Sequence, residues 1–304
     1  MDQKRSQKHH YLPVNYLNGF TDDQGLFFVY DKKEDQIVQK AVTPKSVFFE
    51  NNLNTIALKD ECSDFLEGLY TQTENILWAP FETIRRSKST DQIQPLDRMH
   101  LYLFLTLLYW RLPSNFNQVK SFSSKAFAHN NEIDYFQLKS RNGDVSNEMI
   151  EQMRGSESFN KSVRLILPFA PFLKNKEWFL SVVKWKFVYI EPNTTAFITG
   201  DNPIILKDES GEAVDPLGEF IFPISSNILL ANCDHAIKKE LDPAFVLQAN
   251  IAIMENAKRF VICRSKEFLQ GLVKYYKIYS QYGKTPTIAP EVFAMLIDTE
   301  LEYK

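Results

Sequence analysis

Two adjacent histidines near the start of the chain, in the string Lys8-His9-His10-Tyr11-Leu12-Pro13, are the residues best suited to chemistry. Imidazole changes its charge near neutral pH without help from its surroundings, and it also binds metals. Neighbouring residues of an extended segment point to opposite faces, so we do not expect both histidines to act on one centre. The string therefore contains either a catalytic histidine or a segment that fastens the N-terminus to the rest of the fold.

A second candidate is the turn Thr199-Gly200-Asp201-Asn202-Pro203, which follows the apolar run Ala196-Phe197-Ile198. The pattern predicts a strand that delivers Asp201 and Asn202 to its end, where a rigid sheet can position loop side chains for function. Aspartate and asparagine are also common in turns because they hydrogen-bond nearby backbone groups. The spacing leaves both interpretations open.

Two predicted helices carry further charged candidates. We expect one helix from Asp64 to about Arg86, on which Glu67 and Glu74 lie seven residues apart and border the apolar face. Such carboxylates are either solvated or positioned as site acids. The other helix, Pro95 to about Leu112, is apolar on nearly all sides and ends with Arg111. An arginine there suits the helix dipole, and if it is buried it needs water or an acidic partner.

The elements around these candidates predict an α+β fold. Gly25 to Asp31 and Gln36 to Val42 indicate an N-terminal β-hairpin, which is followed by a helical middle region. The C-terminal part indicates an antiparallel or mixed β-sheet flanked by helices. Pro80 is expected to kink or split the helix that contains it. We predict a single domain over residues 1–304, with sub-regions 8–60, 61–176 and 177–304.

Composition and motifs exclude several classes of protein. The formal net charge is −3, so a nucleic-acid site would have to be a local patch, for which Lys4, Arg5 and Lys8 are candidates. Three scattered cysteines indicate neither a disulfide framework nor a zinc knuckle. The sequence has no His-Glu-x-x-His helix, phosphate-binding glycine loop, Gly-x-Ser-x-Gly elbow or Asp…Glu-x-Lys nuclease core. The absence of a signal segment, and of any apolar run near the roughly 20 residues of a spanning helix, predicts a cytoplasmic protein without membrane contact.

The opening string resembles that of an uncharacterised, mainly microbial family, domain-of-unknown-function family 4238, whose signature is approximately His-Tyr-Val-Pro, then Tyr-Leu and Phe. The resemblance covers about residues 8–264, with Leu12 where Val is usual and Gly200 where Ser is usual. It implies a shared architecture and a cluster of His10, Glu74, Arg111 and Asp201, and it leaves His9 as a solvent-facing neighbour. The matching stretches are His10 to Pro13, Tyr16-Leu17, Phe20, Tyr30-Asp31, Glu74, Arg111-Leu112-Pro113, Thr199 to Pro203 and Pro223-Ile224-Ser225.

Histidine together with carboxylates and arginine is a set of groups suited to phosphodiester chemistry. In the first hypothesis the chain is a phosphodiester hydrolase, a nuclease-like toxin or defence effector. His10 is then the general acid or base, Tyr11 donates a further hydrogen bond, and Arg111 steadies the phosphate. Glu74 and Asp201 orient His10 or hold a metal ion, Mg²⁺ or Mn²⁺.

Two other hypotheses use the same residues differently. In one, the cluster is non-catalytic and belongs to a module that binds or senses a nucleotide, a peptide or a viral component. In the other, it is purely structural, because buried charged groups are normally paired and a polar cluster alone does not indicate catalysis. The geometry discriminates among them: His10, Glu74, Arg111 and Asp201 should converge on an open pocket if the cluster is functional, whereas convergence in a sealed core would favour the structural hypothesis.

Overall fold

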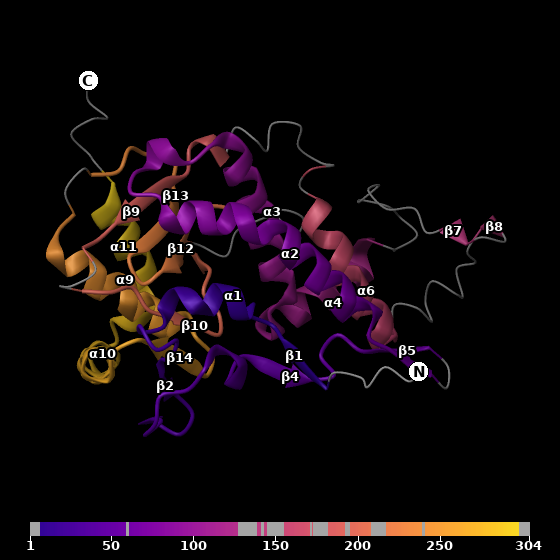
Figure 1. Cartoon of the computed structure of the whole chain (residues 1–304), viewed down its shortest axis with the longest axis horizontal. Coiled ribbons are helices and arrows are strands. Elements are labelled where there is room, and N and C mark those ends of the chain that lie inside the picture. The colour runs from indigo at the N-terminus through magenta and orange to yellow at the C-terminus, as the bar shows by residue number, and fades with distance from the viewer. Residues whose placement is uncertain are drawn as a thin grey trace.

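The computed structural model describes residues 7–58, 61–126, 139–140, 143–144, 155–170, 172, 182–191, 195–207, 217–238 and 241–297. The fold is α+β, as the sequence predicts: strands at the N-terminal end, a helical middle, then strands and helices (Figure 1). The strands that pair in the described residues all do so in antiparallel fashion.

The helices are α1 (Val14–Leu17), α2 (Phe65–Arg86), α3 (Pro95–Arg111), α4 (Phe116–Ala126), α6 (Glu157–Ile166), α9 (Pro243–Asn256), α10 (Lys266–Gln281) and α11 (Ile288–Leu296). The N-terminal strands are β1 (Lys8–His10), β2 (Phe28–Asp31), β3 (Gln36–Ile37), β4 (Phe49–Asn51), β5 (Ile56–Leu58) and β6 (Glu61–Ser63). The later strands are β7 (Lys139–Ser140), β8 (Gly143–Asp144), β9 (Lys186–Tyr189), β10 (Thr199–Gly200), β11 (Ile205–Leu206), β12 (Phe220–Ser225), β13 (Ile228–Asn232) and β14 (Phe260–Cys263).

Helix α2 buries the apolar face that its sequence predicts. Leu66, Tyr70, Leu77 and Phe81 recur at helical spacing and are all buried. The helix continues across Pro80 to Arg86, so of the two predicted effects of the proline, a kink or a split, the split does not occur. Contacts along the buried face stabilise the helix on both sides of the proline, which outweighs the single hydrogen bond that proline cannot donate.

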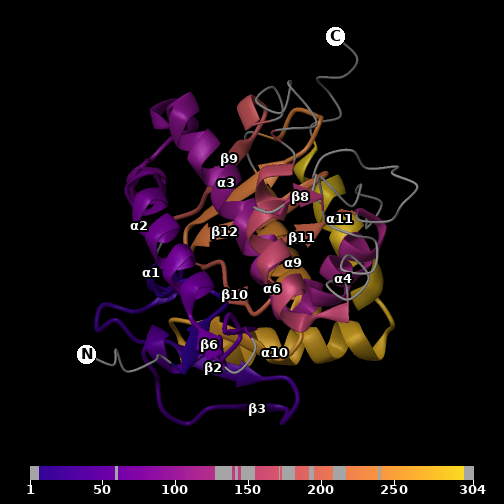
Figure 2. The same cartoon turned by 90° about the vertical axis from the view of Figure 1, so that its right-hand side faces the viewer.

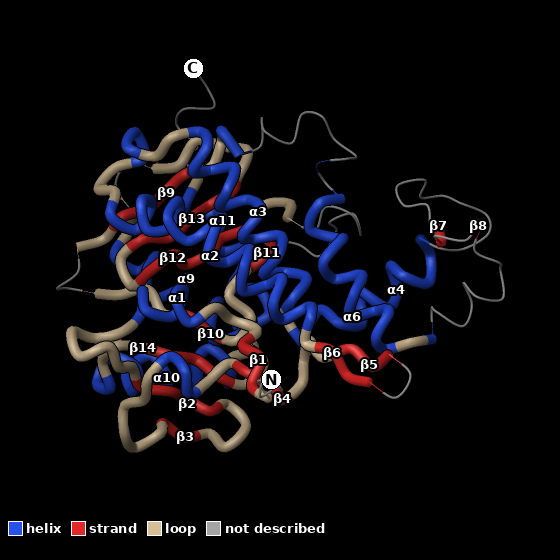
Figure 3. Tube along the Cα trace, turned by 45° about the vertical axis from the view of Figure 1, so that its right-hand side comes forward, coloured by secondary structure: helices blue, strands red, loops and turns tan. Residues whose placement is uncertain are grey.

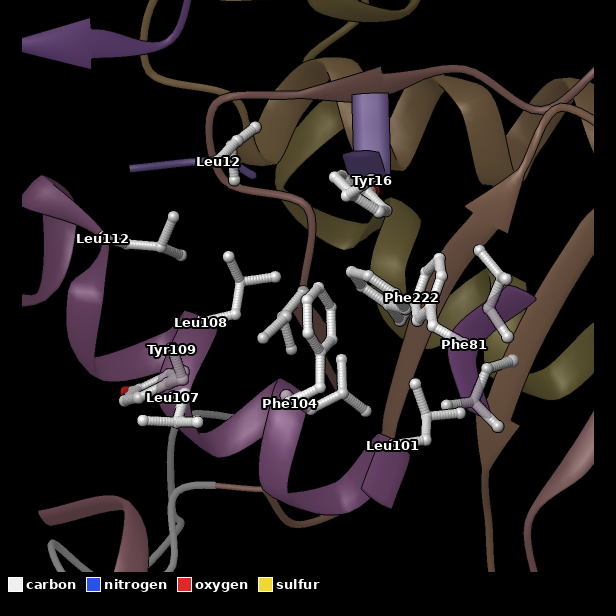
Figure 4. Packing of buried hydrophobic residues seen from close by; sticks show 14 of the residues in the cluster. Leu12, Tyr16, Phe81, Leu101, Phe104, Leu107, Leu108, Tyr109, Leu112 and Phe222 are labelled. Atoms are coloured by element: carbon white, nitrogen blue, oxygen red, sulfur yellow. The ribbon is translucent and has the colours of Figure 1, made fainter. Parts of the chain in front are cut away.

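Helix α3 is buried on nearly all sides, as expected from its composition. It begins at Pro95, where the missing N–H is not needed, and Gln94 and Asp97 form a capping box at this end. Figure 4 shows Phe104 and Leu108 of this helix directed toward the side on which Tyr16 and Phe222 of β12 lie. The ring of Tyr16 stacks on that of Phe222 at 5.2 Å between centroids.

The predicted N-terminal hairpin is present, but it belongs to a larger sheet. β2 pairs with β3, and its other edge pairs with β14 from the C-terminal part, giving the order β10-β14-β2-β3 (Figure 3). Asp201, directly after β10, donates its backbone N–H to the carbonyl of Phe260 at 3.0 Å. This sheet therefore brings the turn at residue 201 beside the start of β14.

The second four-stranded sheet, β11-β12-β13-β9, is buried on both faces. Phe222 belongs to the cluster that contains the apolar faces of α2 and α3, whereas its neighbour Ile221 belongs to the cluster of α9 and α11. Figure 2 shows these strands between the two groups of helices. Successive side chains of a strand point to opposite faces, and helices cover both faces of this sheet. Every residue of β12 is therefore buried, and its sequence from Phe220 to Ile224 is an apolar run.

Some expectations concern residues outside the described part of the chain. A helix expected at Ser146–Met153 lies there, and so do Lys4 and Arg5 of the proposed basic patch. Over the residues that are described, no helix has the length and apolar character needed to cross a membrane.

Candidate functional site

The N-terminal segment, which we define as residues 8–20, is fastened to the fold along its length. Its first three residues form β1, which pairs with β4, and the N–H of Tyr11 donates to the carbonyl of Phe48 at 2.9 Å. Further on, the fully buried hydroxyl of Tyr16 shares a 2.7 Å hydrogen bond with Thr199 Oγ1. The segment therefore reaches from the helical region to the strand that precedes Asp201.

His9 is fully buried, so the expectation that it faces solvent is wrong. Its Nδ1 accepts the backbone N–H of Asn54 at 3.0 Å, and carboxylate oxygens of Asp64 and Glu67 lie 4.0 and 3.8 Å from its ring nitrogens. Glu67 also accepts a hydrogen bond from the amide of Asn54 at 2.7 Å. The two histidines do point to opposite faces, but the inner face of β1 carries His9 because the strand packs beside the start of α2.

His10 is half-buried, with one ring nitrogen bonded and one accessible. Its Nε2 lies 3.3 Å from the carbonyl oxygen of Lys45, and because a carbonyl can only accept, Nε2 carries the hydrogen. No residue that the structure describes is hydrogen-bonded to Nδ1. Burial is the main cause that lowers the pKa of His10 from its ordinary value, the charge of Arg111 adds to this, and the Lys45 carbonyl and the carboxylates of α2 oppose it. His10 is therefore neutral at pH 7.

Glu74 and Arg111 form an ion pair between α2 and α3. The Arg111 side chain is 5% exposed and that of Glu74 is 28% exposed, so the carboxylate is the more accessible member. The guanidinium also lies 4.5 Å from the ring centroid of Tyr70. Arg111 thus has the acidic partner that a buried arginine at this helix end requires, and the pair influences His10 through its charges rather than by a hydrogen bond.

Asp201 is buried and binds backbone groups of a distant segment. Its carboxylate accepts the N–H groups of Lys258, Arg259 and Phe260 at 2.7, 2.7 and 3.0 Å. Burial raises the pKa of Asp201, and these three hydrogen bonds act in the opposite direction. Asp201 therefore holds the approach to β14 in place, and it makes no hydrogen bond with His10.

Two cavities adjoin the N-terminal segment, and four of the five predicted site residues line one or the other. The smaller, the Arg111 cavity, has a volume of about 20 Å³. The larger, the Arg259 cavity, has a volume of about 260 Å³. His10 lines neither cavity, but its ring meets that of Phe49, in the wall of the Arg259 cavity, at 5.6 Å between centroids. The Arg111 cavity is lined by Pro13, Tyr70, Thr73, Glu74, Leu77, Phe104, Leu107, Leu108 and Arg111. The Arg259 cavity is lined by Tyr11, Phe49, Glu50, Pro113, Ser114, Asp201, Lys258, Arg259 and Phe260.

The predicted metal ligands, Glu74 and Asp201, are engaged by the protein itself. Glu74 is paired with Arg111, and Asp201 accepts three backbone N–H groups. Within the described ranges, no three His, Cys, Asp or Glu side chains are placed to hold a metal ion. These contacts do not support the predicted Mg²⁺ or Mn²⁺ site.

Two cations lie against aromatic rings that line the Arg259 cavity, an arrangement that the sequence did not reveal. The ammonium of Lys8 lies 4.5 Å from the ring centroid of Phe49, and the guanidinium of Arg259 lies 4.5 Å from that of Phe260. Arg259 also donates two hydrogen bonds to Asp31, yet its side chain remains 48% exposed. Its pKa is raised by that pairing. No local pattern marks these residues, because three strands and a turn bring them together.

Comparison with known proteins places the chain in a family. No curated protein and no solved structure matched it. The sequence profile of the family described as "Protein of unknown function (DUF4238)" matches residues 8–267. That range contains both cavities and all the predicted site residues. The chain belongs to the DUF4238 family, as the opening string indicates.

Proposed function

We propose that the chain hydrolyses phosphodiester bonds of single-stranded nucleic acid at the surface formed by His10 and the Arg259 cavity. The observation that carries the proposal is the state of the His10 ring. Its Nε2 is held by the carbonyl of Lys45, while Nδ1 has no hydrogen-bond partner among the described residues. An imidazole that is neutral and oriented in this way is suited to accept a proton at its other nitrogen.

The walls of the Arg259 cavity favour a nucleic-acid strand as the substrate. Lys258 and Arg259 are exposed cations that suit phosphate oxygens, and Phe49 and Phe260 are half-buried rings that suit the faces of bases. A chain with a net charge of −3 has to concentrate such cations locally if it is to bind a polyanion. Phe49 lines this cavity together with Lys258 and Arg259, and its ring meets that of His10 at 5.6 Å between centroids.

Each candidate residue has a separate role in this proposal. Nδ1 of His10 accepts the proton of the attacking hydroxyl, either water or a ribose 2′-hydroxyl, as the oxygen bonds to phosphorus and the ester oxygen leaves. Arg111 and Glu74 are positioning residues, because their charges shift the pKa of His10 in opposite directions, in addition to the larger effect of burial, without touching substrate. Tyr11 lines the cavity and its buried hydroxyl keeps its proton, since burial raises its pKa.

The test is cleavage of labelled single-stranded RNA and DNA by the full chain, with EDTA, Mg²⁺ or Mn²⁺. His10→Gln keeps a donor for the Lys45 carbonyl but has no basic nitrogen, so the rate should fall by about 100-fold or more. Cleavage of RNA alone, with a cyclic phosphate product, would identify the 2′-hydroxyl as the nucleophile.

The matched control is His235→Gln, the same change at an exposed histidine between β13 and α9. This variant should cleave at the wild-type rate. The proposal fails if the wild-type chain cleaves none of these substrates, or if His10→Gln remains active with an unchanged melting temperature.

A binding module is the second candidate function. It is favoured by the contacts that Arg111 and Asp201 already make within the protein. Both are already engaged, by a carboxylate and by three backbone N–H groups, so neither needs a substrate to satisfy it. A module of this kind would bind an oligonucleotide without consuming it, with a Kd that rises with salt. Lys258→Gln would then weaken binding, whereas His10→Gln would leave it nearly unchanged.

A further inference from the structure

A second group of polar side chains lies deeper than His10 and consists of Arg164 of α6, Arg111 of α3 and Tyr70 of α2. Their exposed fractions are 1%, 4% and 2%. The Arg111 guanidinium lies over the Tyr70 ring, and the charges of both arginines act on the Tyr70 hydroxyl. Burial lowers the pKa of Arg164, and the like charge of Arg111 lowers it further. Three helices therefore bring two cations and a hydroxyl group together in the interior.

These side chains present hydrogen-bond donors that find no acceptor. Arg164 donates from Nη2 to the Leu53 carbonyl and to Asn54 Oδ1, at 3.2 and 3.0 Å. Its Nε and Nη1, the Nε of Arg111 and the hydroxyl of Tyr70 have no hydrogen-bond partner among the residues that the structure describes. Buried polar groups in native proteins are normally satisfied, so this many unmatched donors in one place calls for an acceptor from outside the protein.

The charges of the group do not balance either. Glu74 compensates Arg111, but in the described part of the chain no carboxylate is within ion-pair distance of Arg164. The acidic residues that act on Arg164 from further away, Glu50 and Glu157, are exposed. A guanidinium does not lose its proton in a protein, and an uncompensated buried charge is strongly unfavourable. Among the described residues Arg164 therefore has no carboxylate in direct contact, and Glu67 reaches it only through the side chain of Asn54, which accepts from Arg164 and donates to Glu67.

The Arg111 cavity offers room for such a counterion. Tyr70 and Arg111 line it, and its volume of about 20 Å³ exceeds the roughly 10–15 Å³ that a single water-sized particle needs. Most of the remaining wall is apolar, including Leu77, Phe104 and Leu107. The carboxylate of Glu74 also lines the cavity, where it is paired with Arg111, and Arg164 does not line it. An occupant therefore has to be satisfied mainly by the two donors. A water molecule would bring two O–H donors of its own, which would need acceptors in this mainly apolar wall. An acceptor without hydrogens avoids that requirement.

We propose that a single monatomic anion, chloride, binds in the Arg111 cavity between the Tyr70 hydroxyl and Arg111 Nε. It accepts hydrogen bonds from these two donors and compensates the charge of Arg164 behind them. This site goes beyond the proposed function, because it needs no substrate and no turnover. It makes the packing of α2, α3 and α6 dependent on an anion.

The test measures the thermal unfolding of the full chain while chloride replaces gluconate at constant ionic strength. Gluconate is a much larger anion than chloride and should not replace it between the two donors, so the melting temperature should rise with chloride and then saturate. At a chloride concentration about ten times the Kd, the rise should be about 3 °C. Bromide should act in the same way, and crystals grown in bromide should show an anomalous peak beside Tyr70.

Two variants test the donors and the charge. Tyr70→Phe removes only the hydroxyl and should abolish the saturable rise. Tyr276→Phe, which removes a hydroxyl that donates to Glu255 on α9, should keep it. Arg164→Met should also lose the chloride dependence, and in gluconate it should be at least as stable as wild type, because it removes an unpaired buried charge.

The proposal is overturned if gluconate and chloride give the same melting temperature, or if Tyr70→Phe responds to chloride as wild type does. A water molecule in the cavity of a bromide-grown crystal would also overturn it. If Arg164→Met does not fold, the comparison of Tyr70→Phe with Tyr276→Phe still decides the question. Because the readout is stability, a failure to detect nuclease activity has no bearing on the outcome.

Discussion

At the scale of single residues, His9 and His10 show that two identical neighbouring side chains can differ greatly in burial and hydrogen bonding. His9 is fully buried and hydrogen-bonded to the backbone of Asn54, whereas His10 is half-exposed and held at only one ring nitrogen. The carboxylates and the arginine near His10 act in opposite directions on its pKa, and burial decides the sign. The outer histidine is therefore the one available to a ligand.

The lowered pKa of His10 predicts a specific pH dependence of stability. The folded state binds a proton at His10 less readily than the unfolded state, whose pKa is near 6.5. Stability contributed by neutral His10 is therefore present above that value and is lost as the pH falls through it. Denaturant unfolding of His10→Gln between pH 7.5 and 5 should show a smaller loss of stability than wild type. An equal or larger loss would contradict the assigned direction.

At the scale of elements, the junction of β10 with β14 is the most tightly specified part of the site. Asp201 binds the backbone of residues 258–260, and Gly200 lies directly against the end of α9. A Cβ at position 200 would lie 2.8 Å from the Cβ of Ala257 and 3.0 Å from the carbonyl oxygen of Phe260. The serine that the family pattern usually has there would not fit this chain without a shift of the backbone.

Gly200→Ser should therefore destabilise the protein by about 2 kcal/mol, because the added atoms overpack the junction. The companion change Ala257→Gly should recover part of the loss by removing the nearer of the two contacts. Gly271→Ser on α10 is the matched control, since a Cβ at that position meets nothing within 4 Å. Chemical denaturation measures all three variants. If Gly200→Ser has the same denaturation midpoint as wild type, the junction has room for the added side chain and the prediction is contradicted.

At the scale of the whole molecule, the two ends of the chain are interleaved. β2 pairs with β14, and the N-terminal segment hydrogen-bonds to Thr199 and packs on Phe222. The sheet that contains β12 contributes to one hydrophobic cluster with α2 and α3 and to another with α9 and α11. Each of the three predicted sub-regions therefore contributes to a core that it shares with another.

This interleaving predicts that the chain unfolds as one cooperative unit, as expected of the single domain predicted from the sequence. Trp110 in the helical region and Trp185 before β9 are both buried and report on different parts of the molecule. Urea unfolding curves from tryptophan fluorescence and from far-UV circular dichroism should coincide, and they should also coincide for Trp110→Phe, in which Trp78, Trp178 and Trp185 remain as reporters. Two separate transitions would instead indicate two domains.

The sequence by itself determined the elements whose signals are local. The periodicity of α2 and α3, the β-hairpin, the apolar runs of the C-terminal strands and the candidate residues His10, Arg111 and Asp201 all follow from patterns within short windows. Membership of the family follows from strings of the same kind. The α+β class needs nothing more, because the type of an element depends mainly on the spacing of its own residues.

Only the tertiary structure decided which side chains meet. Asp201 resembles a turn residue in the sequence, but its partners lie 57 to 59 positions away, and Glu74 pairs with Arg111 across 37 positions. The inward face of His9 and the unmatched donors of Tyr70 and Arg164 likewise depend on how strands and helices pack. Such contacts leave no local pattern, because packing between distant segments sets the direction and burial of a side chain. The candidate site therefore forms only where the N-terminal segment, α2, α3 and β14 come together.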